Sequence, residues 1–355
     1  MARILILTNQ RLSADTAEGV ARPYRQALSG GEVHVVSHAG TDASRHAMVL
    51  SAIDRLTPDL VVTTTAKTYP SSRDEATELL GRLGQARVAY YDGDAYGGRA
   101  KPVPQALRFW IERAGHSFST AAGAHLRLLS GVNHRPVHYV PYVAPLEFTG
   151  FNYNSGSTNP DGITMIANTT SRSVPLLRRP VPFSGLPGEA GRFALVNRLR
   201  RSSGVRFHLW GSGWPRGWSR GLLQFQDQLQ TLIEYRVSAC WDHYPEYPGY
   251  FSNRLPIAML AGRHHVTTDH GGMGWLREIP GVHLESTPRA AAEKAIALAR
   301  EERPTELGSE AREFVKAHLT GTHLARFILS NFQLADAPEG PPWEAARALS
   351  EEAKY

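Results

Sequence analysis

One stretch of the chain, from Phe207 to Trp275, decides the expected fold. It holds short apolar runs that each end in a polar or glycine-rich turn, and they read Phe207-His208-Leu209-Trp210-Gly211-Ser212-Gly213-Trp214, Val237-Ser238-Ala239-Cys240-Trp241-Asp242-His243 and His265-Val266-Thr267-Thr268-Asp269-His270-Gly271-Gly272. Apolar runs of this length, bounded by turn residues, are typical of buried strands. In an open parallel sheet the loops after the strands line one edge, and ligands bind there. The stretch therefore predicts a sheet and its ligand site together.

The rest of the second half alternates strands with helices. Strands are expected at Ile163–Ala167, Val205–Trp210, Val237–Trp241, His265–Thr268 and Val282–Leu284. Helices are expected at Leu255–Ala261, Ala290–Arg300, Ser309–Leu319 and Leu324–Asn331, with a short helical tail from Trp343. Strands that alternate with amphipathic helices predict a parallel sheet covered on both faces.

The first half shows the same alternation. Strands are expected at Ile4–Leu7, Val33–Ser37, Leu60–Thr64, Val88–Tyr91, Ser117–Ser119 and His138–Val140, with helices such as Arg45–Leu56 and Asp74–Leu83. The polar segment Asn9–Gly19 is expected to be a loop at the ligand edge. Pro145–Gly162 is rich in Asn, Ser, Gly and Pro, which is typical of a linker. We therefore expect an α/β protein with domains at 1–150 and 162–323, and a helical segment at 324–355 that can cross back to the first domain.

Composition limits the classes of protein to consider. The 355 residues are 42% hydrophobic and 20% charged, as in a soluble globular protein. No bilayer-length apolar stretch and no signal sequence is visible, so a cytoplasmic location is expected. Cys240 is the single cysteine, which excludes an internal disulfide and a cysteine zinc site, and its apolar surroundings predict a buried, inert thiol. The net charge of +6 suits a polyanion such as nucleic acid, or a phosphorylated donor; the alternative is an ordinary basic surface.

Four features of the opening stretch resemble the donor-sugar half of the spore-maturation-type (CgeB-like) glycosyltransferases. They are the Gly-x-Gly-Trp turn at Gly211, the Ser-x-Arg helix start at Ser252, the Ala261-Gly262 pair and the strand that ends in Thr268-Asp269. The resemblance is spread over nearly the whole chain and is strongest from Val205 to Gly274. It implies two facing Rossmann-like domains of the GT-B type with a cleft between them. The first domain would hold the acceptor, and the second the nucleotide sugar.

The resemblance places the donor beside several loops. In the turn of Gly211, Ser212, Gly213 and Trp214, glycines let the backbone approach a phosphate, and the indole offers a stacking surface; the alternative is a tight turn. At Ser252, Asn253 and Arg254, a helix start and a guanidinium suit a diphosphate; the alternative is an ordinary N-cap with a surface arginine. The remaining donor residues are expected to be Arg172, Asp269, Gly271 and Gly272.

The chain departs from the pattern at one place. Many retaining enzymes of this fold have a glutamate in the helix after Ser252 that holds the donor ribose, whereas this chain has Pro256-Ile257. Ribose contact is then expected from another carboxylate, such as Asp242, Glu246 or Glu278. The departure also admits a non-catalytic nucleotide-binding or nucleic-acid-binding protein of the same fold.

Tyr90-Tyr91-Asp92-Gly93-Asp94 is the notable motif of the first half. The resembling family has an acidic pair after this strand, on the acceptor side, where a carboxylate can deprotonate an acceptor hydroxyl. Asp92 and Asp94 are therefore the candidate catalytic residues. The alternatives are an Asp-Gly turn with capping aspartates, or a divalent-metal site of the single-domain glycosyltransferase fold.

Together these observations predict a metal-independent glycosyltransferase whose donor substrate is a nucleotide-diphosphate sugar, with no cofactor. The net positive charge, together with the basic run Arg198-Leu199-Arg200-Arg201, suits binding to the phosphates of DNA. A hydroxymethylated base in DNA, flipped out of the duplex, is therefore one expected acceptor. The competing acceptor class is a small natural product or a polysaccharide precursor. No spaced His/Glu cluster indicates a metal site.

Overall fold

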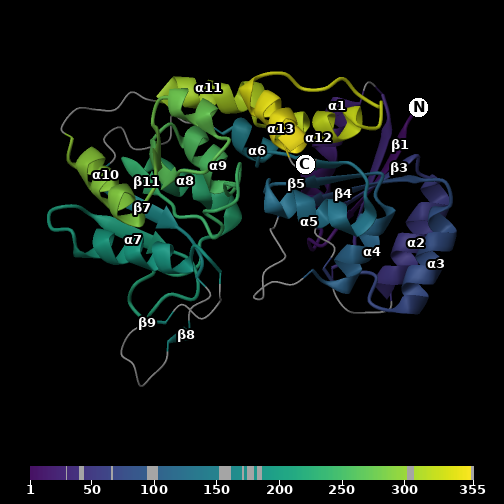
Figure 1. Ribbon diagram of the computed structural model, residues 1–355, viewed down its shortest axis with the longest axis horizontal. Coiled ribbons are helices and arrows are strands. Elements are labelled where there is room, and N and C mark those ends of the chain that lie inside the picture. Colours follow the sequence, from purple (N-terminus) through teal and green to yellow (C-terminus); the bar gives the residue numbers. More distant parts are fainter. Residues whose placement is uncertain are drawn as a thin grey trace. The chain divides into compact units, whose positions relative to one another are not determined.

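The structure is a computed structural model. It describes residues 1–28, 30–39, 44–64, 67–93, 103–151, 161–169, 172–173, 180–181, 186–301 and 308–352. The chain forms two compact units: Met1–Pro141 together with Thr320–Tyr355, and Tyr142–Leu319 (Figure 1).

The first unit is built on a parallel sheet of six strands in the order β2-β1-β3-β4-β5-β6. The strands are β1 (Arg3–Thr8), β2 (Glu32–Ser37), β3 (Leu60–Thr64), β4 (Arg87–Asp92), β5 (His116–Ser119) and β6 (Val137–Tyr139). The helices are α1 (Ala14–Ala27), α2 (Ser44–Leu56), α3 (Arg73–Leu83), α4 (Gln105–Arg113), α5 (Ala124–Asn133), α12 (Gly321–Ser330) and α13 (Pro341–Glu352).

Both faces of this sheet are covered, which explains why Ile4–Leu7 is apolar at every position and fully buried. Helices α1 and α12 pack side by side, and α13 packs on β6, while α2 to α5 lie along the other face (Figure 1). The start of α1 corrects one expectation. The helix begins at Ala14, and the Ser13 side chain accepts a hydrogen bond of 3.2 Å from the Thr16 amide. The loop expected through Gly19 therefore ends at Ser13, because a serine N-cap starts the helix there.

The second unit is built on a parallel sheet of five strands in the order β10-β7-β11-β12-β13. The strands are β7 (Ile163–Ile166), β10 (Phe207–Trp210), β11 (Val237–Ala239), β12 (His264–Thr268) and β13 (Val282–Glu285), with a small antiparallel pair, β8 (Arg172–Ser173) and β9 (Pro180–Val181). The helices are α6 (Leu146–Thr149), α7 (Glu189–Arg201), α8 (Gln228–Ile233), α9 (Arg254–Ala261), α10 (Pro288–Arg300) and α11 (Gly308–His318), with 3-10 turns η2 (Phe225–Asp227) and η3 (Gly274–Glu278).

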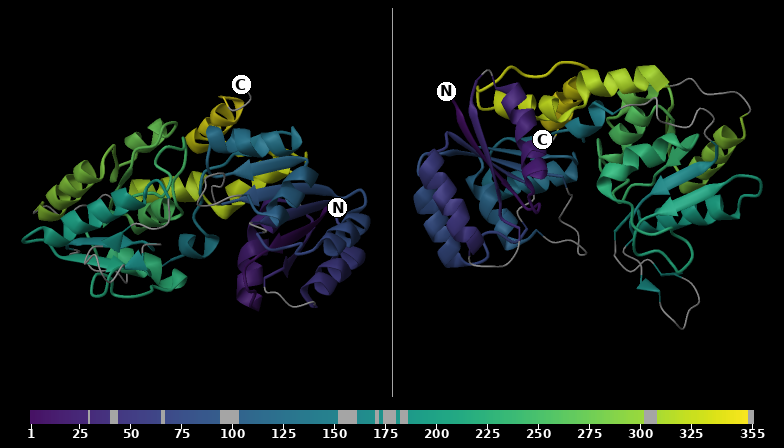
Figure 2. Two further views of the ribbon diagram at one scale, coloured as in Figure 1. Left: turned by 60° about the horizontal axis from the view of Figure 1, so that its bottom comes forward. Right: turned by 180° about the vertical axis from the view of Figure 1, so that it is seen from behind.

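Two hydrophobic clusters cover this second sheet. Leu195, Leu199 and Ala295, from α7 and α10, pack with the strands on one face. Helices α8, α9 and α11 form the other cluster, and Figure 2 shows the strands between the helices. Helix α9 is buried from Leu255 to Ala261 because neighbours surround it, and Gly262 ends it in the left-handed conformation, with φ 63°.

The α/β fold class expected from the sequence is confirmed. Each expected strand is present, with its ends shifted by at most two residues. In both sheets the first strand of the unit lies between the second and the third, so the strand order reverses between β1 and β3 and between β7 and β11. Ligands of doubly wound sheets bind at such a switch point, outside the carboxyl ends of the strands. No helix in the described ranges is long and apolar enough to cross a membrane.

Buried histidines of the second unit predict a pH dependence of stability. Burial lowers the pKa of His264, His265 and His283 from 6.5 to about 4. Between these values the unfolded chain binds more protons than the folded one, so the stability is complete above pH 6.5 and decreases as the pH falls towards 4.

His265→Gln removes one of these groups; the ring of His265 is buried, with Nδ1 2.7 Å from the Ser238 hydroxyl oxygen. The slope of the unfolding free energy against pH near pH 5 is expected to decrease by about 1.4 kcal/mol per pH unit, the value for one proton. Urea unfolding between pH 4.5 and 7 measures the slope. An unchanged slope would show that the pKa of His265 is the same in the folded and the unfolded chain.

Candidate functional site

A buried arginine lies at the switch point of the second sheet. Arg192, on α7, is 2% exposed, and its Nε donates a 2.8 Å hydrogen bond to the Trp241 carbonyl oxygen after β11. Its Nη1 donates a 2.8 Å bond to the Asn168 carbonyl oxygen after β7. Burial lowers the pKa of the Arg192 guanidinium, and the nearby charge of Arg254 lowers it further. Arg192 therefore joins the two loops that border the switch point.

The first turn of α7 presses against the same loops. The carboxylate of Glu189 is buried, accepts a hydrogen bond from the Thr169 hydroxyl and lies 3.0 Å from His243 Nε2. A Cβ atom at Gly188 would lie 1.8 Å from the Asp242 carbonyl oxygen, and one at Gly191 would lie 2.3 Å from the indole nitrogen of Trp241. Glycine at both positions is what permits this approach.

A carboxylate-histidine pair forms the next part of the edge. Asp242 Oδ2 lies 3.1 Å from His270 Nε2, and both side chains are buried. Burial acts to raise the pKa of Asp242, but the His270 hydrogen bond and the charges of His270, Arg192 and Arg254 outweigh it, so this pKa is lowered. The opposite ring atom, His270 Nδ1, is buried without a hydrogen-bond partner among the described residues. Asp242 therefore fixes the orientation of the His270 ring.

The predicted residues Ser252, Asn253 and Arg254 lie at the start of α9, beside this pair. The Ser252 side chain lies near the Cys240 thiol, and the Asn253 side chain makes no capping bond. The Nε atom of Arg254 is buried and finds no hydrogen-bond partner in the described part of the chain. Burial raises the pKa of the Cys240 thiol to about 11, in keeping with the inert thiol expected. The guanidinium of Arg254 thus lies at the helix start with donor capacity to spare.

The glycine turn after β10 packs closely against the loop after β7, and this packing by itself requires glycine. The Ser212 amide donates a 2.9 Å hydrogen bond to Asn168 Oδ1, and the Trp214 indole donates one of 2.6 Å to the Ala167 carbonyl oxygen. Cβ atoms at Gly211 and Gly213 would lie about 2 Å from the carbonyl oxygens of residues 167 and 169. The Trp214 ring packs on Phe193 and Trp218. The turn is therefore fitted against the loop after β7, and phosphate contact and base stacking stay predictions.

Gly213→Ala should destabilise the protein more than Gly217→Ala. Both glycines have a positive φ, 82° and 76°, but only at Gly213 would the Cβ meet an atom, the Thr169 carbonyl oxygen at 1.8 Å; at Gly217 nothing lies within 4 Å. The φ angle alone costs about 1–2 kcal/mol in either variant. The clash adds to it in Gly213→Ala only. Urea unfolding of both variants measures the difference, and equal losses would show that the turn can move away from the 167–169 loop.

The other predicted donor residues lie at separate places. Asp269 forms an ion pair with Arg277, and the Gly271 carbonyl oxygen accepts a 2.7 Å hydrogen bond from the Gly249 amide. Gly272 has φ 80°, which suits glycine in this exposed turn. The structure describes the backbone of Arg172, in β8, but its side chain lies outside the described residues.

In the first unit, Asp92 ends β4 and is fully buried. Its Oδ2 accepts a 2.6 Å hydrogen bond from the Tyr90 hydroxyl, and its carbonyl oxygen accepts one of 3.3 Å from the Thr120 amide. Asp94 lies outside the described residues, so the geometry of the pair is not defined. Within the described ranges, no three His, Cys, Asp or Glu side chains are grouped so that they could hold a metal ion.

The residues of α7 were not predicted from the sequence. Glu189 and Arg192 lie about 50 residues before Trp241 and Asp242, and they meet them only through tertiary packing. Gly188 and Gly191 could have indicated them. Two glycines three positions apart at a helix start lie on one face of the helix, and that face can pack closely against a neighbouring backbone.

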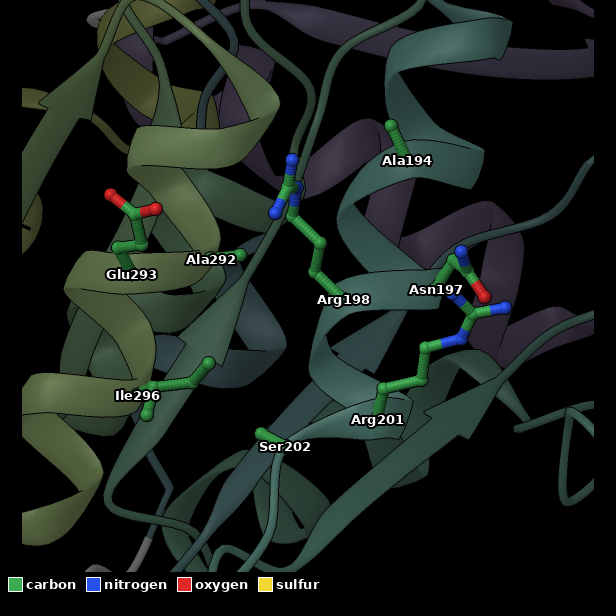
Figure 3. Close-up of a pocket in the computed structure, with 8 residues that line it drawn as sticks. All are labelled: Ala194, Asn197, Arg198, Arg201, Ser202, Ala292, Glu293 and Ile296. Carbon is green, nitrogen blue, oxygen red and sulfur yellow. The ribbon is translucent and has the colours of Figure 1, made fainter.

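A cavity of the second unit lies away from these residues. It has a volume of about 470 Å³ and is lined by Ala194, Asn197, Arg198, Arg201, Ser202, Ala292, Glu293 and Ile296. Figure 3 shows these side chains on two neighbouring helices, α7 and α10, with Ser202 directly after the end of α7. None of the predicted site residues lines it, so we place the candidate site at the carboxyl edge of the sheet.

Comparison with known proteins identifies the fold. No protein-family model and no curated protein sequence matches the chain. HepE from Anabaena, in complex with UDP and glucose, aligns over 94% of this chain and 100% of its own, with TM-score 0.56 and 14% identity. Sucrose-phosphate synthase from Thermosynechococcus elongatus aligns over 94% and 98%, with TM-score 0.57 and 11% identity. An α1,3-fucosyltransferase aligns over 94% and 89%, with TM-score 0.50 and 10% identity. The resemblance to the CgeB-like family stays a prediction, whereas the two Rossmann-like domains of the GT-B fold are confirmed.

Proposed function

We propose that the protein is a glycosyltransferase that moves a sugar from a nucleotide-sugar donor to an acceptor hydroxyl. Two lines support the proposal. The similar folds include HepE, solved with UDP-glucose, and a sucrose-phosphate synthase. The second unit also places Arg254 at the start of helix α9, on the edge of the sheet where doubly wound sheets bind ligands.

Arg254 is the observation that carries the proposal. Its guanidinium stands at the first residue of α9, where the helix dipole favours an anion. Its buried Nε has no hydrogen-bond partner among the described residues. Unpaired buried donors are costly unless a ligand pairs them. A diphosphate would supply the missing acceptors, and no apolar ligand would.

The arrangement supplies what sugar transfer requires. As the bond between the sugar and the diphosphate breaks, negative charge develops on the departing phosphate, and fixed donors beside it stabilise that charge. Arg254 is proposed to bind the phosphate, and Arg192 to hold the two loops around it. Asp242 is proposed to fix the orientation of His270. Because cationic side chains can carry this charge, we propose that the reaction needs no divalent metal.

The acceptor is proposed to bind the first unit, with Asp92 or Asp94 as the base. The net charge of +6 supports a hydroxymethylated base in DNA. The positive charges are spread along the chain without a long Lys/Arg block, and this supports a small hydroxylated molecule instead. Both acceptor classes therefore belong in the test.

A donor screen tests the proposal. Nucleoside diphosphates and their sugars are titrated by calorimetry, and hydrolysis of each bound nucleotide sugar is then followed with and without EDTA. We expect one nucleotide sugar to bind and to be turned over in EDTA. Binding without turnover towards any acceptor, including hydroxymethylated DNA at low salt, would favour the non-catalytic protein of the same fold. Binding of no nucleotide would refute the donor site.

A further inference from the structure

A cavity of the first unit lies away from the carboxyl edge that carries Asp92. It lies beside β6, where α5, α12 and α13 surround it, and His116 and Pro136 border it at the amino-terminal ends of β5 and β6. Its volume is about 790 Å³, within the range of about 300–1,000 Å³ typical of small-molecule sites. We name it the histidine pocket, because its polar lining includes His116, His134, Arg135, His138, Arg347 and Glu351.

Two of its histidines are joined to each other. His116 Nδ1 lies 2.9 Å from His138 Nε2, and the rings of Phe118, Phe327 and Phe332 surround the pair. Burial lowers the pKa of His116. A neutral imidazole has one N–H, so one ring of the pair donates this hydrogen bond to the other.

The rim of the pocket is cationic. Arg135 and Arg347 are exposed on it. An adjoining hollow of about 630 Å³ shares His116 and Arg135, and adds Arg87 and Arg113. Among the described residues that line the two hollows, Glu351 alone carries a carboxylate. The guanidinium charges on these walls therefore outnumber the carboxylate by four to one.

We propose that the histidine pocket binds a phosphate-bearing small molecule at a site separate from the donor site. Planar guanidinium groups match pairs of phosphate oxygens, and the imidazole of His116 belongs to the same lining. The rings of Phe118 and Phe327 add an apolar wall beside the imidazoles. This site would be independent of sugar transfer, because its residues belong to one unit and none of them is a donor residue.

Calorimetric titration of inorganic pyrophosphate tests this. The wild-type protein is compared with Arg254→Ala, which lacks the proposed donor arginine, and with Arg254→Ala that also carries Arg135→Ala and Arg347→Ala. We expect Arg254→Ala to retain one pyrophosphate site, and the triple variant to bind at least tenfold more weakly. The matched control adds Arg127→Ala, an exposed arginine of α5 outside the pocket, to Arg254→Ala and should leave the affinity unchanged.

A spectroscopic measurement accompanies the titration. The ring nitrogen resonances of His116 and His138 should shift when pyrophosphate is added to Arg254→Ala, and should not shift in the triple variant. Three results would each overturn the proposal: no pyrophosphate binding to Arg254→Ala at millimolar concentration, equal affinity in the triple variant, or unmoved histidine resonances. Citrate binding as tightly as pyrophosphate would overturn the assignment to phosphate. None of these results bears on Arg254, so the two sites can fail separately.

Discussion

Arg254→Ala is expected to weaken the binding of a nucleoside diphosphate about 10- to 150-fold. This corresponds to about 1.5–3 kcal/mol, the usual worth of a hydrogen bond to a charged group. The effect should be at the upper end, because the buried Arg254 Nε has no hydrogen-bond partner among the described residues.

Calorimetry on the folded variant measures this loss. Arg289→Ala is the matched control, since Arg289 is an exposed arginine of the same unit that pairs with Glu293 on α10. Surface pairs of this kind contribute little to stability, and Arg289 is no part of the site. If Arg254→Ala binds the nucleotide within twofold of the wild type, the diphosphate lies elsewhere.

The fold could be predicted from the sequence because the information is local. Runs such as Ile4–Leu7 are apolar at every position, and a parallel sheet buried on both faces requires this. The turn residues after each run then fix where the strands end. Asn9–Gly19 was the exception, because a serine N-cap starts a helix at Ala14 within a segment whose composition is that of a loop.

The site could be predicted only in part, for a physical reason. Arg254 was predicted because its surroundings, a helix start after a strand, are close in sequence. Arg192 and Glu189 were missed because their partners, the loops after β7 and β11, are distant in sequence. Contacts of this kind follow from how α7 packs, which no local pattern records.

The glycine turn shows a second limit. Gly211 and Gly213 predict a close backbone approach, but the sequence does not say to what. In the structure their neighbour is the backbone of residues 167–169, whose carbonyl oxygens leave no room for a Cβ. The same residue type serves phosphate binding and protein packing, so the motif alone does not distinguish them.

The acceptor side gives the prediction with the largest effect. Asp92→Asn is expected to slow sugar transfer about 10²- to 10⁴-fold, the range for loss of a general base. Donor affinity should stay within twofold, because the proposed donor residues belong to the other unit. Asparagine keeps the size of the side chain, and its oxygen can still accept the hydrogen bond from Tyr90 that Asp92 accepts at 2.6 Å. The fold should therefore survive the change.

Tyr90→Phe provides the matched control for Asp92→Asn. It removes the hydroxyl that bonds to the carboxylate but leaves the carboxylate itself, so transfer should slow less than tenfold. Asp94→Asn, measured alongside, separates the two candidate bases. Asp92 is fully buried, so a base role requires the acceptor hydroxyl to reach the end of β4 in the complex. If Asp92→Asn and Asp94→Asn both keep more than a tenth of the wild-type rate, the base lies elsewhere, or the transfer needs none because the departing phosphate itself takes up the proton.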